Sequence, residues 1–338
     1  MNDFFTQSPF WHLKIGEIHA LLERVKISEE QHNDVLRLRK YNRILSIHAS
    51  TAIEGNVLTP RQVQDVINGK PVLGPPKDIK EVQNAWAAYD LLEELNPYSS
   101  DDLLKAHACM TAGLVEESGA YRTCGVVVAR GDGTILHQGA PYQDVPYLTV
   151  DLIDWATESS AHPLIKSSAV HFMLEHIHPF RDGNGRIGRL WQTLILSKWN
   201  PLFTWMPVET LVHNNQALYY RALQESHQGT VDCRPFIDFM IDAIENALYK
   251  YVDIATETKN GVIEAETRSI DPINDPINDP IKVVLEEIKS NPRITYDELA
   301  VLLGKSTATV KRIIKNLKQT GKIIRVGSNK TGYWEVLV

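Results

Sequence analysis

The stretch HPFRDGNGRIGR, residues 178–189, decides the fold because it joins a short loop of small residues to charged groups of both signs. Asp182 supplies a carboxylate, a hard ligand suited to Mg²⁺, which binds one or two carboxylates and otherwise waters and substrate phosphates. The triplet Gly183-Asn184-Gly185 can turn several backbone N–H groups toward one anion. A helix expected to begin near Arg186 would add its positive N-terminal end. The stretch therefore predicts a site for nucleotide phosphates.

Three further side chains fit the same site. Arg186 and Arg189 lie three residues apart, so both guanidinium groups share one face of the expected helix and can reach one polyphosphate. His178 stands at the edge of the loop, where its imidazole can take a proton from an incoming hydroxyl group. We expect Phe180 to hold the loop in the core rather than to take part in the chemistry.

A zinc site is an alternative interpretation of the nearby histidines. His171, Glu175 and His178 share a helical face, and His176 is adjacent. No fourth ligand follows at metal-ligand spacing, and the phosphate loop accounts better for His178. We therefore expect His171, Glu175 and His176 to be packing residues or to support the site from behind.

Residues 178–189 resemble the signature of the Fic family, His-x-Phe-x-Asp/Glu-Gly-Asn-Gly-Arg-x-x-Arg, at every specified position. The resemblance implies a protein adenylyltransferase that uses ATP and Mg²⁺ to transfer AMP to a Tyr, Ser or Thr hydroxyl of a protein. Relatives with lysine at the position of Gly185 are kinases, so glycine here favours attack on the α-phosphate. The loop alone leaves open phosphocholine transfer, which occurs in rare relatives. The implied roles are general base for His178, metal ligand for Asp182, α/β-phosphate cradle for Gly183, Asn184 and Gly185, and β- and γ-phosphate contacts for Arg186 and Arg189.

A second motif lies far upstream. Apolar residues at steps of three and four predict one amphipathic helix over residues 35–53, ended by Gly55. Ser50-x-x-x-Glu54-Gly55-Asn56 resembles the inhibitory motif of the Fic family. The resemblance implies that Glu54 pairs with Arg189 and occupies the place of the γ-phosphate, because a carboxylate offers the guanidinium fork the same two-oxygen geometry. In some relatives such a glutamate instead orients water for AMP removal, and this reading stays open.

Two segments beside the loop are candidates for substrate contacts. Residues 123–138 contain two β-prone runs around Arg130-Gly131-Asp132-Gly133 and predict a β-hairpin in an otherwise helical chain. In Fic relatives this hairpin is a flap that aligns the target backbone by strand addition. Tyr220, in a segment that resembles the family's adenine-binding region, is a candidate adenine contact or a core tyrosine.

The C-terminal region differs from the rest in charge. Residues 281–338 contain 11 Lys and Arg against 5 Asp and Glu, net +6, whereas the preceding residues contain 24 against 37, net −13. The repeat DPINDPINDPI, residues 271–281, separates them, because recurrent proline prevents helix and sheet ladders. Three helices (281–290, 296–303 and 307–319) and two strands around a glycine-rich tip follow. They resemble a winged helix-turn-helix domain, with phosphate contacts expected from Lys311, Arg312, Lys315, Lys318 and Lys330.

Composition sets the remaining expectations. Hydrophobic residues make up 43% of the 338 residues, which is ordinary for a globular protein. Three cysteines without a CxxC pair, an N-terminus without a signal-like apolar run and no long apolar window favour a cytoplasmic protein without membrane association. The protein target, self-modification and the oligomeric state are left open.

We therefore expect a mainly α fold with a β-hairpin flap, followed by a small α+β winged-helix domain. The predicted domains are a helical region at 1–96 carrying the inhibitory helix at about 35–55, a catalytic core at 97–255, a helix end and linker at 256–280, and the winged helix at 281–338. The favoured function is an autoinhibited AMP transferase with a protein substrate. The alternative is a DNA-binding regulator that uses the Fic domain as a nucleotide sensor, although a sensor needs no general base.

Overall fold

The computed structural model describes residues 3–30, 35–129, 135–228, 231–259 and 284–336, except 286, 290, 293, 303–306, 320–321 and 327–332. The chain folds as two compact units, residues 1–265 and 266–338. The expected linker repeat lies outside the described residues. Unit 1 contains α1 (Trp11–Glu30), α2 (Val35–Ile53), α3 (Pro60–Ile67), α4 (Pro76–Asp90), η1 (Leu91–Glu93), α5 (Ser100–Thr111), β1 (Val127–Ala129), β2 (Ile135–Gln138), α6 (Val145–Glu158), α7 (Pro163–Ile177), α8 (Asn184–Trp199), η2 (Pro201–Thr204), α9 (Val208–Asn214), α10 (Gln216–Ser226) and α11 (Arg234–Lys259).

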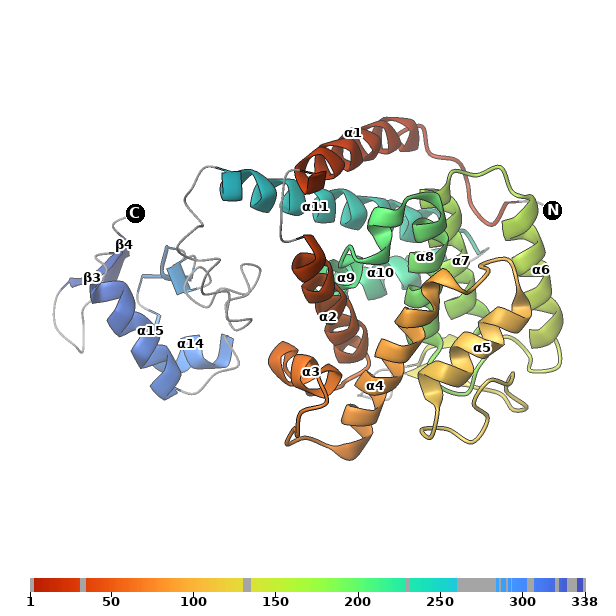
Figure 1. Ribbon diagram of the computed structural model, residues 1–338, viewed down its shortest axis with the longest axis horizontal. Helices are drawn as coiled ribbons and strands as arrows, with labels where there is room; N and C mark the ends of the chain where they lie inside the picture. Colours follow the sequence, from red (N-terminus) through yellow and green to blue (C-terminus); the bar gives the residue numbers. More distant parts are fainter. Residues whose placement is uncertain are drawn as a thin grey trace. The chain divides into compact units, whose positions relative to one another are not determined.

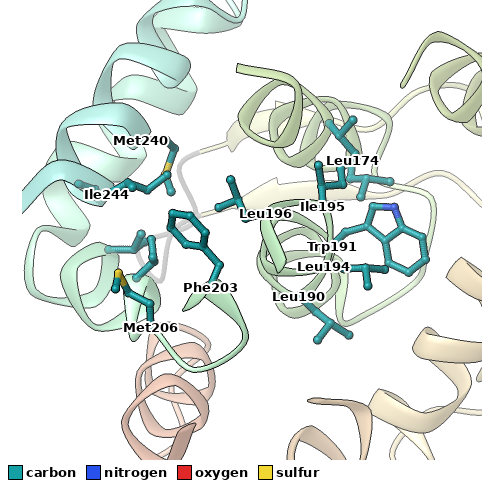
Figure 2. Close-up of a cluster of buried hydrophobic side chains, with 14 of the residues drawn as sticks. Leu174, Leu190, Trp191, Leu194, Ile195, Leu196, Phe203, Met206, Met240 and Ile244 are labelled. Atoms are coloured by element: carbon teal, nitrogen blue, oxygen red, sulfur yellow. The ribbon is translucent and has the colours of Figure 1, made fainter. Parts of the chain in front are cut away.

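Helices α7 and α8 form the buried centre of unit 1 and pack against each other (Figure 1). Pro163 occupies the first turn of α7, where its missing N–H costs no hydrogen bond. Trp191 of α8 is fully buried, and its indole N–H donates to the carbonyl of Pro97 at 3.1 Å. Figure 2 shows apolar side chains of α8, among them Trp191 and Leu196, in one buried cluster with residues of neighbouring elements such as Leu174, Phe203 and Met240. The loop between α7 and α8 is therefore fixed at both ends by core helices.

Helix α2 spans the residues that the sequence predicted, and Gly55 follows it with a left-handed backbone (φ 90°). Leu45 and Ala49 of the predicted apolar face are buried, and so are Ile44 and Ile47, so the buried face is wider than predicted. Helix α2 contacts α9 and the α8 core. This packing brings the C-terminal end of α2 to the N-terminal half of α8.

The predicted hairpin is present. Strands β1 and β2 pair antiparallel, with Val127 opposite Gln138 and a bulge between Val128 and Ala129. Both strands lie within the predicted residues 123–138. The predicted turn, including Arg130, lies outside the described residues.

Unit 2 has the predicted helix-turn-helix and strand order: α14 (Tyr296–Leu302), α15 (Thr307–Gln319), β3 (Ile323–Val326) and β4 (Tyr333–Val336), preceded by helical residues at 284–285 and 287–289. The Thr295 hydroxyl accepts the Glu298 N–H, and the Glu298 carboxylate accepts the Thr295 N–H, so a capping box begins α14. Trp334 packs into the small core beneath the antiparallel β3–β4 pair. The turn residues Ser306 and Lys330 lie outside the described residues.

The three cysteines, Cys109, Cys124 and Cys233, are free thiols. Across the described ranges, no helix combines the length and apolar character needed to cross a bilayer.

Candidate functional site

His178 occupies a strained position at the end of α7. Among the described residues it is the one non-glycine with a positive φ (54°), a left-handed conformation that costs about 1–2 kcal/mol. Its Nδ1 lies 3.3 Å from the carbonyl oxygen of Glu175, so Nδ1 carries the proton and Nε2 keeps a free lone pair. Burial lowers the pKa of His178 to about 4. The imidazole is therefore neutral near pH 7 and can accept a proton at Nε2.

The strained turn is held by Arg122, which the sequence analysis did not single out. Its Nε donates to the carbonyl of His178 at 2.7 Å, and Nη1 donates to the carbonyl of Cys124 at 2.7 Å. Nη2 donates to the carbonyl of Ala140. Arg122 is buried, so its guanidinium fastens both ends of the hairpin segment to the turn that carries His178. A single arginine far upstream gives no spacing signal by which it could have been found.

The loop after His178 is braced from inside the core. The Phe180 ring is buried and stacks on the His107 ring, with centroids 3.7 Å apart and planes 6° apart. His107 Nδ1 accepts the Gly119 N–H, which leaves Nε2–H to donate to the carbonyl of Asp182 at 3.0 Å. The Asn184 side chain accepts the Phe180 N–H and donates to the Phe180 carbonyl. Phe180 is thus the core residue that the sequence predicted, whereas the bracing roles of His107 and the Asn184 side chain were missed.

Asp182 lies at the outer edge of the loop. Its side chain is 47% exposed, and Oδ1 accepts the Gly183 N–H at 2.6 Å. In the described part of the chain no partner is found for Oδ2, so one carboxylate oxygen faces away from the loop contacts. Gly183 has φ 87°, and a Cβ there would lie 2.9 Å from the Thr111 methyl carbon. This turn starts α8 at Asn184, two residues before the predicted start.

Arg186 is a buried cation with spare hydrogen-bond donors. Its side chain is 2% exposed, with Nη1 3.6 Å from Glu81 Oε1 and Nη2 3.4 Å from Asp182 Oδ1. Within the described residues, Nε and Nη1 have no hydrogen-bond partner. Because buried polar groups are nearly always paired, these two donors indicate a site for an external anion. Glu81 was another residue that the sequence analysis did not identify.

Arg189 forms an ion pair with Glu54 at the end of α2, which is the pairing that the resemblance to the inhibitory motif implied. Nη2 donates to Glu54 Oε1 at 2.6 Å, and Nε and Nη2 donate to the hydroxyl and carbonyl of Ser50 at 3.0 and 2.9 Å. The Arg189 side chain is 2% exposed, whereas that of Glu54 is 36% exposed. Burial lowers the pKa of Arg189, but the nearby Glu54 carboxylate more than offsets this and holds the pKa above its usual range. A Cβ at Gly185 would collide with the Glu54 carboxylate, so glycine there makes room for it.

Glu175 lies behind this ion pair. Burial, followed by the negative charge of Glu54, raises its pKa to about 7. Its carboxylate oxygens stand 4.0 Å from His171 Nε2 and from His178 Nδ1. His171 uses Nδ1 with Gln192 at 2.7 Å and Nε2 with the Tyr219 hydroxyl at 3.1 Å. Both nitrogens of His171 are engaged, so the His171–Glu175–His178 zinc alternative is not supported by the geometry.

Tyr220 of α10 lies on the edge of the same region. Its ring is partly buried, and burial, followed by the charge of Glu54, raises its pKa. The side-chain amide of Gln216 donates to the Tyr220 hydroxyl at 3.5 Å and to the carbonyl of Ile53 at 3.3 Å. It therefore connects Tyr220 to the last residue of α2. Tyr219 is the fully buried neighbour, so the two tyrosines divide into one core residue and one at the rim.

The fold and the loop define a helical protein in which a glycine-containing loop joins two core helices, and a carboxylate that follows a third helix pairs with an arginine of the second core helix. A family model described as Fic/DOC family matches residues 97–196, and one described as winged helix-turn-helix DNA-binding matches residues 278–324. A solved structure of a Fic family protein from Desulfovibrio desulfuricans G20 is 35% identical, with a TM-score of 0.72, over 99% of this chain and 98% of that one. This chain belongs to the Fic/DOC family.

Curated relatives carry the name protein adenylyltransferase. The fic-1 proteins of Caenorhabditis briggsae and Caenorhabditis elegans are 29% and 27% identical over 74% and 76% of this chain. The chain spans about half the length of these relatives, 49% and 50%. The solved fragment of C. elegans Fic-1 is 23% identical over 73% of this chain and 75% of that one, with a TM-score of 0.56, and shares the fold.

Proposed function

We propose that this chain transfers AMP from ATP to a hydroxyl side chain of a protein. Relatives named protein adenylyltransferase support the reaction class. The observation that carries the proposal is the state of the two buried arginines. Arg189 already binds a carboxylate, and Arg186 has two buried donors without a hydrogen-bond partner in the described part of the chain. Two such cations beside a glycine-containing loop at a helix N-terminus suit a polyphosphate.

The chemistry assigns one role to each loop residue. His178 Nε2 accepts the proton of the target hydroxyl as its oxygen bonds to the α-phosphorus. The bond from the α-phosphorus to the oxygen that bridges it to the β-phosphorus breaks, and pyrophosphate leaves. Backbone N–H groups of Gly183, Asn184 and Gly185 bind the phosphates. The negative phosphates raise the pKa of His178 from about 4, which makes the imidazole a stronger base when ATP is bound.

Asp182 would hold Mg²⁺. The half-exposed carboxylate with an unpartnered Oδ2 among the described contacts fits a cation that takes one or two carboxylates and otherwise waters and phosphate oxygens. When bound, the ion neutralises part of the phosphate charge. The Gly183 N–H and Arg186 orient this carboxylate through Oδ1.

Glu54 restrains the reaction by occupying Arg189. The carboxylate and a γ-phosphate are both acceptors for the guanidinium fork, and Arg189 cannot serve both in the same geometry. ATP then binds without its γ-phosphate held, which leaves the α-phosphate poorly aligned for in-line attack. Tyr220, at the rim beside the end of α2, is the proposed adenine contact.

Label transfer to protein tests the proposal. ATP labelled at the α-phosphate or, separately, at the γ-phosphate is incubated with wild type, Glu54→Gly and Glu54→Gly/His178→Ala. We expect label from the α position alone, more in Glu54→Gly, and about 10²–10⁴-fold less after loss of the base. Absence of transfer in every folded, ATP-binding variant would refute AMP transfer. Release of AMP from modified protein that requires Glu54 would support the reverse reaction instead.

For unit 2 we propose contact with the phosphates of duplex DNA. Lys311, Lys315 and Lys318 lie exposed along one side of α15 beside Tyr296, and the matching family model is described as DNA-binding. The predicted contact Lys330 and the side chain of Arg312 lie outside the described residues. A gel-retardation assay of the full chain at low salt should detect binding, and Lys311→Ala should reduce the salt dependence of log K by about one phosphate contact. No retardation of any duplex would favour a protein-facing role.

A further inference from the structure

Three histidines that are far apart in the sequence meet at the C-terminal end of α7. His137 lies on β2, His176 is in the last turn of α7, and His227 follows α10. One ring nitrogen from each lies within 4.8 Å of those of the other two. The ring centroids of His137 and His227 are 4.1 Å apart, and those of His176 and His227 are 5.1 Å apart. The residues are separated by 39 and 51 positions in the sequence, so no local motif announces the cluster.

Hydrogen bonds fix the tautomers of two of these rings. His137 Nε2 lies 2.7 Å from the carbonyl oxygen of His176, and His227 Nδ1 lies 2.6 Å from that of Leu223. A carbonyl can only accept, so both nitrogens carry protons and leave His137 Nδ1 and His227 Nε2 with free lone pairs. Metal-binding histidines in proteins commonly donate their other N–H to a backbone carbonyl in this way.

Two nitrogens of the cluster are buried without a partner. Within the described residues, His176 Nδ1 and His227 Nε2 have no hydrogen bond. A buried polar nitrogen without a partner costs free energy, and a cation bound to its lone pair would remove that cost. Phe172 underlies the cluster, with its ring centroid 4.8 Å from that of His227 and 6.1 Å from that of His176. One side of the cluster is therefore apolar and limits access of water.

The protonation states also suit a metal. Burial, with mutual repulsion between the rings, lowers the pKa of His176 to about 4, and burial lowers that of His227 to about 4. Burial lowers the pKa of His137 as well. Neutral imidazoles are the form that binds metal ions.

We propose that His137, His176 and His227 form a binding site for a divalent transition metal, with Zn²⁺ as the best fit. Zinc binds imidazole nitrogen at about 2.0–2.1 Å with tetrahedral geometry, which places ligand nitrogens about 3.3 Å apart. The ring nitrogens already lie within 4.8 Å of one another, so small side-chain rotations would bring them to that spacing. A water molecule would take the fourth position, as in three-histidine sites. Mg²⁺ prefers oxygen ligands and should not compete.

A metal ion at this site would connect three parts of the chain. It would join β2, through His137, to the segment after α10, through His227, and to α7, through His176, which lies two residues before His178. Arg122 fastens the ends of the same hairpin segment to the turn at His178. The metal would therefore fix β2 of the hairpin against α7. Metal binding itself does not depend on the proposed AMP transfer.

Equilibrium dialysis of the full chain against Zn²⁺, with Mg²⁺ in excess, tests the site. We expect one bound ion in wild type and at least about 100-fold weaker binding in His137→Ala and in His227→Ala, because even outer partners of metal ligands contribute 10- to 100-fold. His19→Ala is the matched control, because His19 and His162 form another histidine pair with Nε2 atoms 3.3 Å apart. Its Zn²⁺ affinity should stay at the wild-type value.

A second measurement locates the ion. Hydrogen exchange of the β1 and β2 amides should slow when Zn²⁺ is added to wild type and stay unchanged in His227→Ala. Circular dichroism confirms that each variant is folded, and the two ligand variants lie on different elements, so misfolding of one leaves the other as the test. Absence of Zn²⁺ binding in wild type, or binding that both ligand variants retain, would overturn the proposal even if AMP transfer is confirmed.

Discussion

Replacement of Glu54 by alanine tests how strongly the end of α2 competes for Arg189. A hydrogen bond between charged groups contributes about 1.5–3 kcal/mol net, and breaking a fully buried ion pair costs about 3–5 kcal/mol. The lower range applies here, because Glu54 is 36% exposed and Ser50 still accepts two hydrogen bonds from Arg189. Glu54→Ala should therefore lower the free energy of unfolding by about 1.5–3 kcal/mol without nucleotide.

A contact of similar strength should appear in nucleotide binding. In wild type ATP binds without its γ-phosphate held by Arg189, whereas without Glu54 the γ-phosphate can bind this arginine, and ADP has no γ-phosphate. Loss of Glu54 should tighten ATP binding by about 10- to 150-fold, since each 1.4 kcal/mol is tenfold, and should change ADP binding little. The ratio of the two dissociation constants, measured by titration calorimetry with Mg²⁺, isolates the γ-phosphate contribution.

A matched control separates this effect from general loss of an ion pair. Asp65 on α3 pairs with Arg61 and Lys70 at 3.3 and 3.1 Å on the surface. Asp65→Ala should leave both dissociation constants unchanged. An ATP-to-ADP ratio that is equal in wild type and Glu54→Ala would refute the competition between Glu54 and the γ-phosphate.

Three further predictions concern the parts that hold the site. His171 is fully buried, and burial lowers its pKa to about 3, against 6.5 for an exposed histidine. Its contribution to the free energy of unfolding is therefore complete above pH 6.5 and is lost as pH falls toward 3. Between pH 7 and pH 5, the free energy of unfolding measured by urea titration should fall by about 2 kcal/mol more in wild type than in His171→Gln. Arg122→Lys removes the planar fork that holds His178, and label transfer in the Glu54→Gly background should fall about 10²-fold with little change in ATP affinity; equal turnover would contradict this role. Gly183→Ala should cost at least about 1–2 kcal/mol of stability because φ is 87° and the Thr111 methyl is close, whereas Gly125→Ala, with open space around it, should be nearly neutral in the same assay.

The features that the sequence predicted are those with local signals. Helix α2 follows from its apolar periodicity and the glycine after it, and the predicted bounds agree with the structure. The helix predicted at 296–303 likewise begins at Tyr296 in the structure, directly after the Thr295–Glu298 capping box, which is a local feature. The predicted start of α8 was two residues late, because the left-handed Gly183 ends the loop and lets Asn184 begin the helix.

The features that were missed depend on long-range contacts. Arg122 acts on carbonyls 56 residues away at His178, and His107 acts on the carbonyl of Asp182 75 residues away. A backbone carbonyl has no sequence signature, so neither partner could be recognised from residue types. The cluster of His137, His176 and His227 depends in the same way on how β2, α7 and α10 pack together.

The hydrogen bonds that hold the loop also bear on the proposed inhibition by Glu54. The described hydrogen bonds of Arg122, His107 and Asn184 lie within the loop, the last turn of α7, the α5 region and the hairpin segment, and none involves α2. These hydrogen bonds therefore hold the loop without any contribution from α2. The direct contacts of Glu54 with this region are the hydrogen bond from Arg189 and the close approach to Gly185. For the proposed inhibition, this separation supports occupancy of Arg189 without distortion of the loop, so activation would need to move the end of α2 away from Arg189.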